Sequence, residues 1–136
     1  MYKTRYANIQ DSEQILAMYS NQETYGGIFD TTRDTMHTIL KLIENNEITV
    51  VESNESVLLG SVQLLTNSHS AWLLRFSIVD NSEAIQALFN FASSELKSLG
   101  HKSVIIYSPS DGAFDERYQS LGLNKGNSYS AFSADL

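Results

Sequence analysis

The sequence predicts a single mixed α/β (α+β) domain in which helices flank a mixed, mostly antiparallel central sheet. Segments with the alternation typical of strands are interleaved with segments whose apolar residues recur every three or four positions, as on one face of a helix. From residue 71 onward, the chain reads as strand, helix, strand, which is a parallel crossover unit. With 136 residues, 42% of them hydrophobic, the chain 1–136 fits one domain with its own core.

The elements are expected in the order strand, helix, helix, strand, strand, strand, helix, strand, helix, strand. The sheet then has six or seven strands, flanked by about four helices. The expected strands include residues 2–8, 48–52, 57–65, 71–79, 103–107 and 128–134. The expected helices begin at Asp11, near Thr31 and after Asn81, and the last one ends in residues 118–123.

The first strand and the first helix each have a local signature. In the first strand the uncharged residues Tyr2, Thr4 and Tyr6 alternate with the charged residues Lys3 and Arg5. This alternation is typical of a half-exposed strand. Asp11 is expected to cap the first helix, with Gln14 as the returning partner of a capping box.

Residues 20–30 lose this periodicity and are expected to form a loop, to which Gly26-Gly27 gives backbone freedom. The second helix follows, with Asp34 in its first turn. Its apolar side chains lie on one face: Met36, Ile39, Leu40 and Ile43.

A hairpin and a final strand complete the antiparallel part of the sheet. Residues 53–56 form a polar connection of hairpin length. Gly60 interrupts the second hairpin strand and indicates a bulge or a close approach of another backbone. In the final strand, Tyr129, Ala131 and Ser133 share one face and Phe132 takes the other.

The helix of the crossover unit has the clearest pattern. Gly100 follows it as a left-handed C-cap. Its apolar side chains form one stripe: Ile85, Leu88, Phe89, Ala92, Leu96 and Leu99. Where the preceding strand gives way to this helix, such a unit leaves a backbone-lined opening that favours ligands carrying phosphates.

Composition excludes several classes of function. The formal charge of -7 argues against a nucleic-acid backbone or an anionic membrane as the partner. The 16 acidic residues are too spread out for a DNA mimic. Without cysteine there is no disulfide, thiolate metal site or cysteine nucleophile. His37, His69 and His101 fall in three separate elements, so no metal site is expected. Since no apolar run resembles a membrane span or a signal peptide, we expect a cytoplasmic protein.

Several motifs resemble the GNAT superfamily of acetyl-coenzyme A (acetyl-CoA) dependent N-acetyltransferases. They are the order of elements, the opening Tyr-Ala-Asn-Ile-Gln-Asp-Ser-Glu-Gln-Ile at 6–15, the Leu-Leu-Gly-Ser-Val of the hairpin at 58–62, and Tyr-Gln-Ser-Leu-Gly-Leu at 118–123. The resemblance covers nearly the whole chain in topology. Its Tyr-x-x-Leu-Gly-hydrophobic ending is the most specific part.

The resemblance implies where the acyl donor binds. In this family the central strand splays from its neighbour, and its exposed backbone groups pair with the pantetheine arm. The corresponding residues here are Phe76, Ser77, Ile78 and Val79. The following turn presents N–H groups to the pyrophosphate, which maps to 80–84 and includes Asn81, Ser82 and Ala84. The family often has an asparagine at the end of the strand before the last helix, and here it is replaced near Asp111, which the resemblance places at the coenzyme.

The resemblance also implies a mechanism. An amine attacks the thioester carbonyl, a backbone N–H near Ile78 polarises that carbonyl, and Tyr118 protonates the departing thiolate. Tyr25 and Phe29 in the loop 20–30, together with the hairpin, are expected to select the acceptor, a small-molecule or peptide amine. Arg75 is a candidate for holding an acidic group of the substrate or coenzyme.

Plainer interpretations remain open for each of these residues. Tyr118 also fits the packing stripe of its helix, and Arg75 suits a surface ion pair. Asp80, Asn81 and Ser82 are good N-cap residues whatever else they do.

The turn at 79–84 departs from the family pattern because it has no glycine and no basic residue, whereas Asp80 and Glu83 bring two carboxylates. This favours an alternative function, in which a GNAT-like module has lost catalysis and coenzyme A binding and serves in binding or assembly. Its cleft and its last strand would then hold a partner chain or a second copy, so a homodimer is a further expectation.

Overall fold

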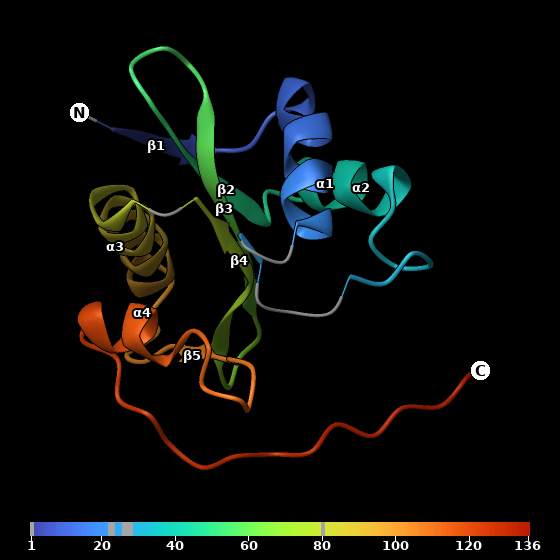
Figure 1. Cartoon of the computed structure of the whole chain (residues 1–136), viewed down its shortest axis with the longest axis vertical. Helices are drawn as coiled ribbons and strands as arrows, with labels where there is room; N and C mark the ends of the chain where they lie inside the picture. Colours follow the sequence, from blue (N-terminus) through green and yellow to red (C-terminus); the bar gives the residue numbers. More distant parts are fainter. Residues whose placement is uncertain (1, 22–23, 26–28, 80) are drawn as a thin grey trace.

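A computed structural model describes residues 2–21, 24–25, 29–79 and 81–136 (Figure 1). Gly26, Gly27 and Asp80, which the sequence analysis singled out, lie outside these residues. The strands are β1 (Lys3–Tyr6), β2 (Ile48–Glu52), β3 (Leu58–Thr66), β4 (Ala71–Ile78) and β5 (Ile105–Ile106). The helices are a short 3-10 turn η1 (Ile9–Asp11), α1 (Ser12–Ser20), α2 (Met36–Glu44), α3 (Ser82–Ser98) and α4 (Asp115–Ser120).

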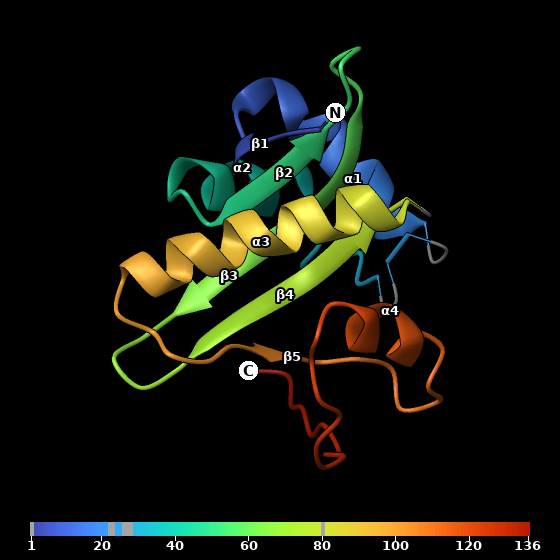
Figure 2. The ribbon, with the colours of Figure 1, turned by 90° about the vertical axis from the view of Figure 1, so that its left-hand side faces the viewer.

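The five strands form one sheet in the order β1-β2-β3-β4-β5. Neighbours are antiparallel except β4 and β5, which α3 joins as a parallel crossover pair. Helices cover both faces of the sheet, with α1 and α2 on one side and α3 on the other (Figure 1). Figure 2 shows α3 running across its face of the sheet. The predicted α/β architecture and crossover unit are therefore confirmed.

Each face of the sheet has its own apolar cluster, because successive strand residues point to opposite sides. The α3 face holds Val51, Val62, Leu64, Leu73, Phe76, Ile78, Leu88 and Ala92, among others. The face under α1 and α2 holds Ile15, Tyr19, Ile39, Ile48, Val50 and Leu58, among others. All five residues of β2 are buried, as expected for a strand covered on both faces.

An ion-pair cluster fixes the edge strand β1. Arg5 contacts Asp11 at 2.7 Å and Glu52 of β2 at 3.2 Å. The predicted cap is wrong here: Asp11 makes no side-chain cap of α1, and it accepts the Asn8 N–H at 2.8 Å instead. Asn8 and Asp11 form a capping box around η1, and Gln14 accepts the Leu58 N–H at 3.4 Å. Asp11 does mark the start of the helix, but its carboxylate pairs with the Arg5 guanidinium and does not cap α1.

Two further predicted elements have different bounds. The second helix begins at Met36 rather than near Thr31, because residues 31–35 form turns and Thr35 caps α2 by accepting the Thr38 N–H at 3.2 Å. The strand expected at 103–107 is limited to Ile105–Ile106.

The final strand expected at 128–134 is wrong, so the sheet has five strands rather than six or seven. Its residues are exposed, Phe132 to 95%. Alternation indicates the faces that a strand would have, but a strand also needs a neighbour to pair with, and no strand among the described residues pairs with this segment. Among the described residues, no helix has the length and apolarity needed to cross a membrane.

Gly60 of β3 lies directly against β4, as the sequence analysis allowed. An added Cβ would lie 2.9 Å from Ile78 Cγ1 and 3.0 Å from the Ser77 carbonyl oxygen. The close approach presses the end of β4 onto β3 at the pair Gly60↔Ile78.

We therefore expect Gly60→Ala to lower the free energy of unfolding by about 1–3 kcal/mol, because the methyl group overpacks a buried strand pair. Urea denaturation monitored by circular dichroism measures this change. Gly126→Ala is the control, since nothing lies within 4 Å of a Cβ at that position. Equal stability of the two variants would contradict the close approach.

Candidate functional site

The main feature of the sheet is an opening between β4 and β5. The two strands pair only at Trp72↔Ile105 and Leu73↔Ile106. Beyond Leu73, β4 continues to Ile78 beside β3. The expected divergence of these two parallel strands is therefore confirmed.

The backbone of β4 turns one amide into this opening. Val79 donates its N–H to the Leu59 carbonyl of the β3 side at 2.9 Å. Ile78, the residue before it, donates its N–H to the opposite edge, because successive strand amides point in opposite directions. The acceptor is the Thr24 carbonyl at 2.9 Å. Expected as a free backbone group, the Ile78 amide is instead bonded within the chain, since a fully buried N–H requires an acceptor.

Thr24 and Tyr25 thus lie where a further strand would pair with β4. Tyr25 forms an antiparallel bridge with Ser77. The end of α1 holds this segment: Tyr25 donates its N–H to the Asn21 carbonyl at 2.9 Å, and the Thr24 hydroxyl lies 2.9 Å from the Met18 carbonyl. The Tyr25 ring lies 5.7 Å from the ring of Tyr19.

Tyr118 of α4 lies on the α3 side of β4. Its ring meets the edge of the Phe76 ring with 6.0 Å between centroids, so the packing interpretation is correct. Burial raises the pKa of the Tyr118 phenol to about 12. The hydroxyl therefore stays protonated at neutral pH and can donate a proton.

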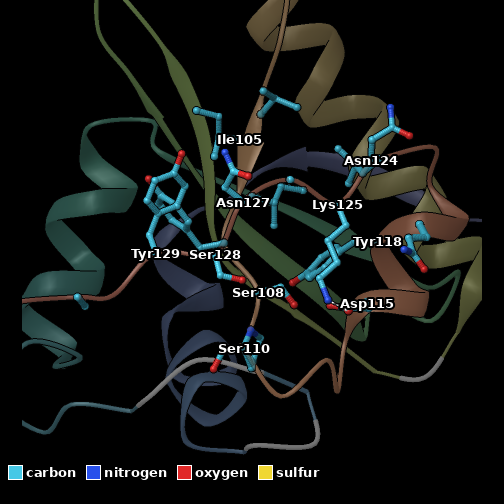
Figure 3. A pocket seen from close by; sticks show the side chains of 18 of the residues that line it. Ile105, Ser108, Ser110, Asp115, Tyr118, Asn124, Lys125, Asn127, Ser128 and Tyr129 are labelled. Atoms are coloured by element: carbon cyan, nitrogen blue, oxygen red, sulfur yellow. Dashed lines mark hydrogen bonds and ion pairs between the residues drawn. The ribbon is translucent and has the colours of Figure 1, made fainter.

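A cavity of about 840 Å³ lies beside Tyr118, between β5, α4 and the C-terminal segment. Its lining includes Ser108, Asn127 and Tyr129, and Lys125 Nζ contacts Asp115 Oδ2 there at 2.6 Å (Figure 3). No β4 residue contributes to this lining. Tyr118 consequently touches both the cavity and the strand that opens from β5.

The start of α3 is capped by the side chain of Asn81. Asn81 Oδ1 accepts the Ala84 N–H at 3.0 Å, and Asn81 Nδ2 donates to the Tyr2 hydroxyl at 2.8 Å. Ser82 is the first helical residue, and Glu83 lies in the first turn. The N-cap interpretation of Asn81 is thus confirmed. Asp111 lies apart, where it accepts the Ala113 N–H at 2.9 Å.

Arg75 lies on the other face of β4, where it is taken up by an ion pair. Its Nε donates to Asp34 Oδ1 at 2.9 Å, and its Nη1 donates to Gln63 Oε1 at 3.2 Å. The Asp34 side chain is only 2% exposed, so this pair is internal rather than on the surface. Phe29 packs against the apolar cluster of the same face.

Thr24 and Gln63 carry no functional signal in the sequence, and Asp34 indicates only the start of a helix. The hydrogen bond between Thr24 and Ile78 joins backbone atoms. Any residue type can make such a bond, so the sequence does not indicate it. Asp34 and Arg75 are 41 positions apart in the sequence, so their contact could not be predicted from local pattern either. Among the described residues, no group of histidine and carboxylate side chains could hold a metal ion.

Comparison with known proteins gives the fold. No family model and no curated protein matches the sequence. The chain is similar to the PaiA N-acetyltransferase of Thermoplasma acidophilum, solved with coenzyme A, at 20% identity and a TM-score of 0.72 over 88% of each chain. A GNAT family acetyltransferase from Listeria monocytogenes has 15% identity and a TM-score of 0.66 over 94% of this chain and 89% of its own.

A third similar structure is a predicted acetyltransferase from Clostridium acetobutylicum, solved with acetyl-CoA. It has 11% identity and a TM-score of 0.69 over 98% of this chain and 96% of its own. The three likenesses cover 88%, 94% and 98% of this chain. The chain therefore has the fold of the GNAT acetyltransferases.

Proposed function

We propose that this protein is an N-acetyltransferase that takes an acetyl group from acetyl-CoA and transfers it to a small-molecule or peptide amine. The observation that carries the proposal is the divergence of β4 from β5 with the Ile78 N–H turned into the opening. Such an N–H can pair with the donor and polarise its thioester carbonyl.

Two groups of the chain would act in the reaction. The amine nitrogen attacks the carbonyl carbon, and the Ile78 N–H stabilises the negative charge that develops on the oxygen. The carbon–sulfur bond then breaks, the thiolate takes the Tyr118 proton, and the amine releases a proton to water. Tyr118 can serve in this step because its phenol is protonated at neutral pH and its ring lies against Phe76 of β4, and it then regains a proton from water.

The donor would have to displace the Thr24 carbonyl, which holds the Ile78 N–H at 2.9 Å. At the start of α3, the Ala84 N–H is also taken, by the Asn81 side chain. These two contacts support the second candidate function, a binding or assembly module without coenzyme A. We favour the transferase because a backbone pair between chain segments can exchange for a pair with a ligand.

Binding of acetyl-CoA separates the two candidates. We expect isothermal titration calorimetry to give a Kd below about 100 μM, equivalent to about -5.5 kcal/mol. In this complex the pantetheine arm would pair with the open edge of β4. No heat and no thermal shift at millimolar acetyl-CoA would instead favour the module.

Tyr118→Phe should lower kcat about 100-fold while leaving the Kd for acetyl-CoA within about twofold, because the ring contact with Phe76 stays and the proton donor is lost. Steady-state kinetics with a panel of amines measures this. Since the pKa of Tyr118 is about 12, the loss should be the same at pH 7 and pH 9. An unchanged kcat would remove the phenol from the mechanism.

Tyr25→Gly should tighten acetyl-CoA binding about threefold to tenfold. The variant loses the ring contact with Tyr19 and gains backbone freedom, so the segment competes less well for the Ile78 N–H. Calorimetry on the variant and on Glu55→Gly, in the exposed turn between β2 and β3, provides the comparison. If both variants bind as the wild type does, Thr24 and the donor do not compete.

A further inference from the structure

Arg75 has a backbone conformation that its side chain disfavours. Its φ of +50° lies in the left-handed region, where residues other than glycine are uncommon. The register between β3 and β4 shifts at the same place, because Ser61 faces Ser77 whereas Gln63 faces Leu74. One residue of β3 is therefore opposed by two of β4, which is a β-bulge. A left-handed residue at a bulge is ordinarily glycine.

Contacts of the Arg75 side chain account for the exception. The guanidinium donates to Asp34 and to Gln63, and it lies 6.0 Å from the centre of the Tyr19 ring. Desolvation is the largest single influence on the pKa of Arg75 and lowers it, but the hydrogen bond that Arg75 donates to Asp34 and the negative charge of Asp34 act with the nearby tyrosines to raise the pKa overall. Because the Asp34 side chain is almost fully buried, each member of the pair needs the other.

Asp34 carries the link on to the loop before α2. Its second oxygen, Oδ2, accepts the Asp30 N–H at 2.8 Å. The pair thus joins the bulge of β4 to the turn that leads into α2. Tyr25, which lies against the opening, contacts the same Tyr19 ring that faces Arg75.

The bulge determines toward which side of the sheet the later residues of β4 point. An extra residue in a strand changes which side every following residue faces. Directly after it, Phe76 points toward Tyr118, and two residues later the Ile78 N–H enters the opening. The strain at Arg75 is therefore located one residue before Phe76, which contacts Tyr118, and three residues before Ile78. Strained residues are common beside functional sites.

We propose that Asp34 and Arg75 form a positioning pair that holds the β4 bulge and so aims the Ile78 N–H and the Phe76–Tyr118 contact. Arg75 is then a positioning residue rather than a ligand for substrate or coenzyme. This inference rests on the proposed function, because it concerns the alignment of the same site.

Replacements at both positions distinguish positioning from ligand binding. Asp34→Asn should lower kcat about tenfold with the KM for acetyl-CoA within about twofold, since the bulge loosens at the reacting carbonyl. If Arg75 instead binds substrate or coenzyme, Asp34→Asn should free the guanidinium for that contact. The KM should then change while kcat stays close to that of the wild type. In the Asp34→Asn background, Arg75→Ala should remain impaired, whereas Arg75→Gly should recover at least threefold in kcat, because glycine adopts the left-handed conformation without strain.

Arg33→Ala is the control, since its ion pair with Asp30 is exposed and adjacent in the chain. It should leave kcat and KM unchanged. Wild-type kinetics in Asp34→Asn, or equal kcat for the alanine and glycine variants at position 75, would overturn the proposal.

A second readout does not depend on activity. In ¹⁵N–¹H spectra the Ile78 amide signal should shift in Asp34→Asn and in its Arg75→Ala derivative, and return toward the wild-type position in the Arg75→Gly derivative. If the wild type neither binds nor uses acetyl-CoA, the proposed function fails. The amide signal then tests the positioning role of Asp34 and Arg75 without reference to activity. If the Ile78 signal is unmoved in all variants, that role is wrong.

Discussion

The arrangement of this molecule depends on the need of a buried backbone N–H for an acceptor. β4 is paired with β3 along its length, but β5 leaves it after Leu73. Ile78 is completely buried, so its amide must be satisfied from elsewhere in the chain. Thr24 supplies the carbonyl, which draws the connection after α1 against the open edge of β4. The opening and the segment that occupies it are consequences of the same requirement.

Charged groups join the helical layer to the sheet at two separate places. Arg5 connects the start of α1 to β1 and β2, and Arg75 connects the turn before α2 to β4. Burial raises the pKa of Asp11, yet the Arg5 guanidinium and the Asn8 N–H outweigh it and keep the pKa below its usual value. In both places a nearly buried carboxylate depends on one guanidinium, so the pairs fix relative position more than they add net stability.

The sequence predicted the sheet, the helices and the crossover because these depend on local periodicity. Divergence of β4 from β5 was reached through the family resemblance, and the structure bears it out. The role of Asn81 as a cap was readable from residue type alone. By contrast, neither the Thr24 contact nor the Asp34–Arg75 pair could be predicted, since one joins backbone atoms and the other depends on tertiary folding.

The two errors in the sheet have a common cause. Residues 128–134 have the composition of a strand, and residues 103–107 also suggested a longer one than Ile105–Ile106. A strand becomes regular only where a neighbour offers matching backbone groups, and periodicity within one segment says nothing about the neighbour.

The two margins of the sheet are unequal in character. β1 carries the exposed Lys3, a charge of the kind that discourages a foreign strand from docking. On the opposite margin, Ile105 is 42% exposed and the following Tyr107 is 61% exposed. A short apolar edge of this kind carries little charge to repel another strand. At high protein concentration, other copies of the chain would therefore associate first on the β5 side. A lysine at this margin would add the kind of charge that Lys3 supplies on β1.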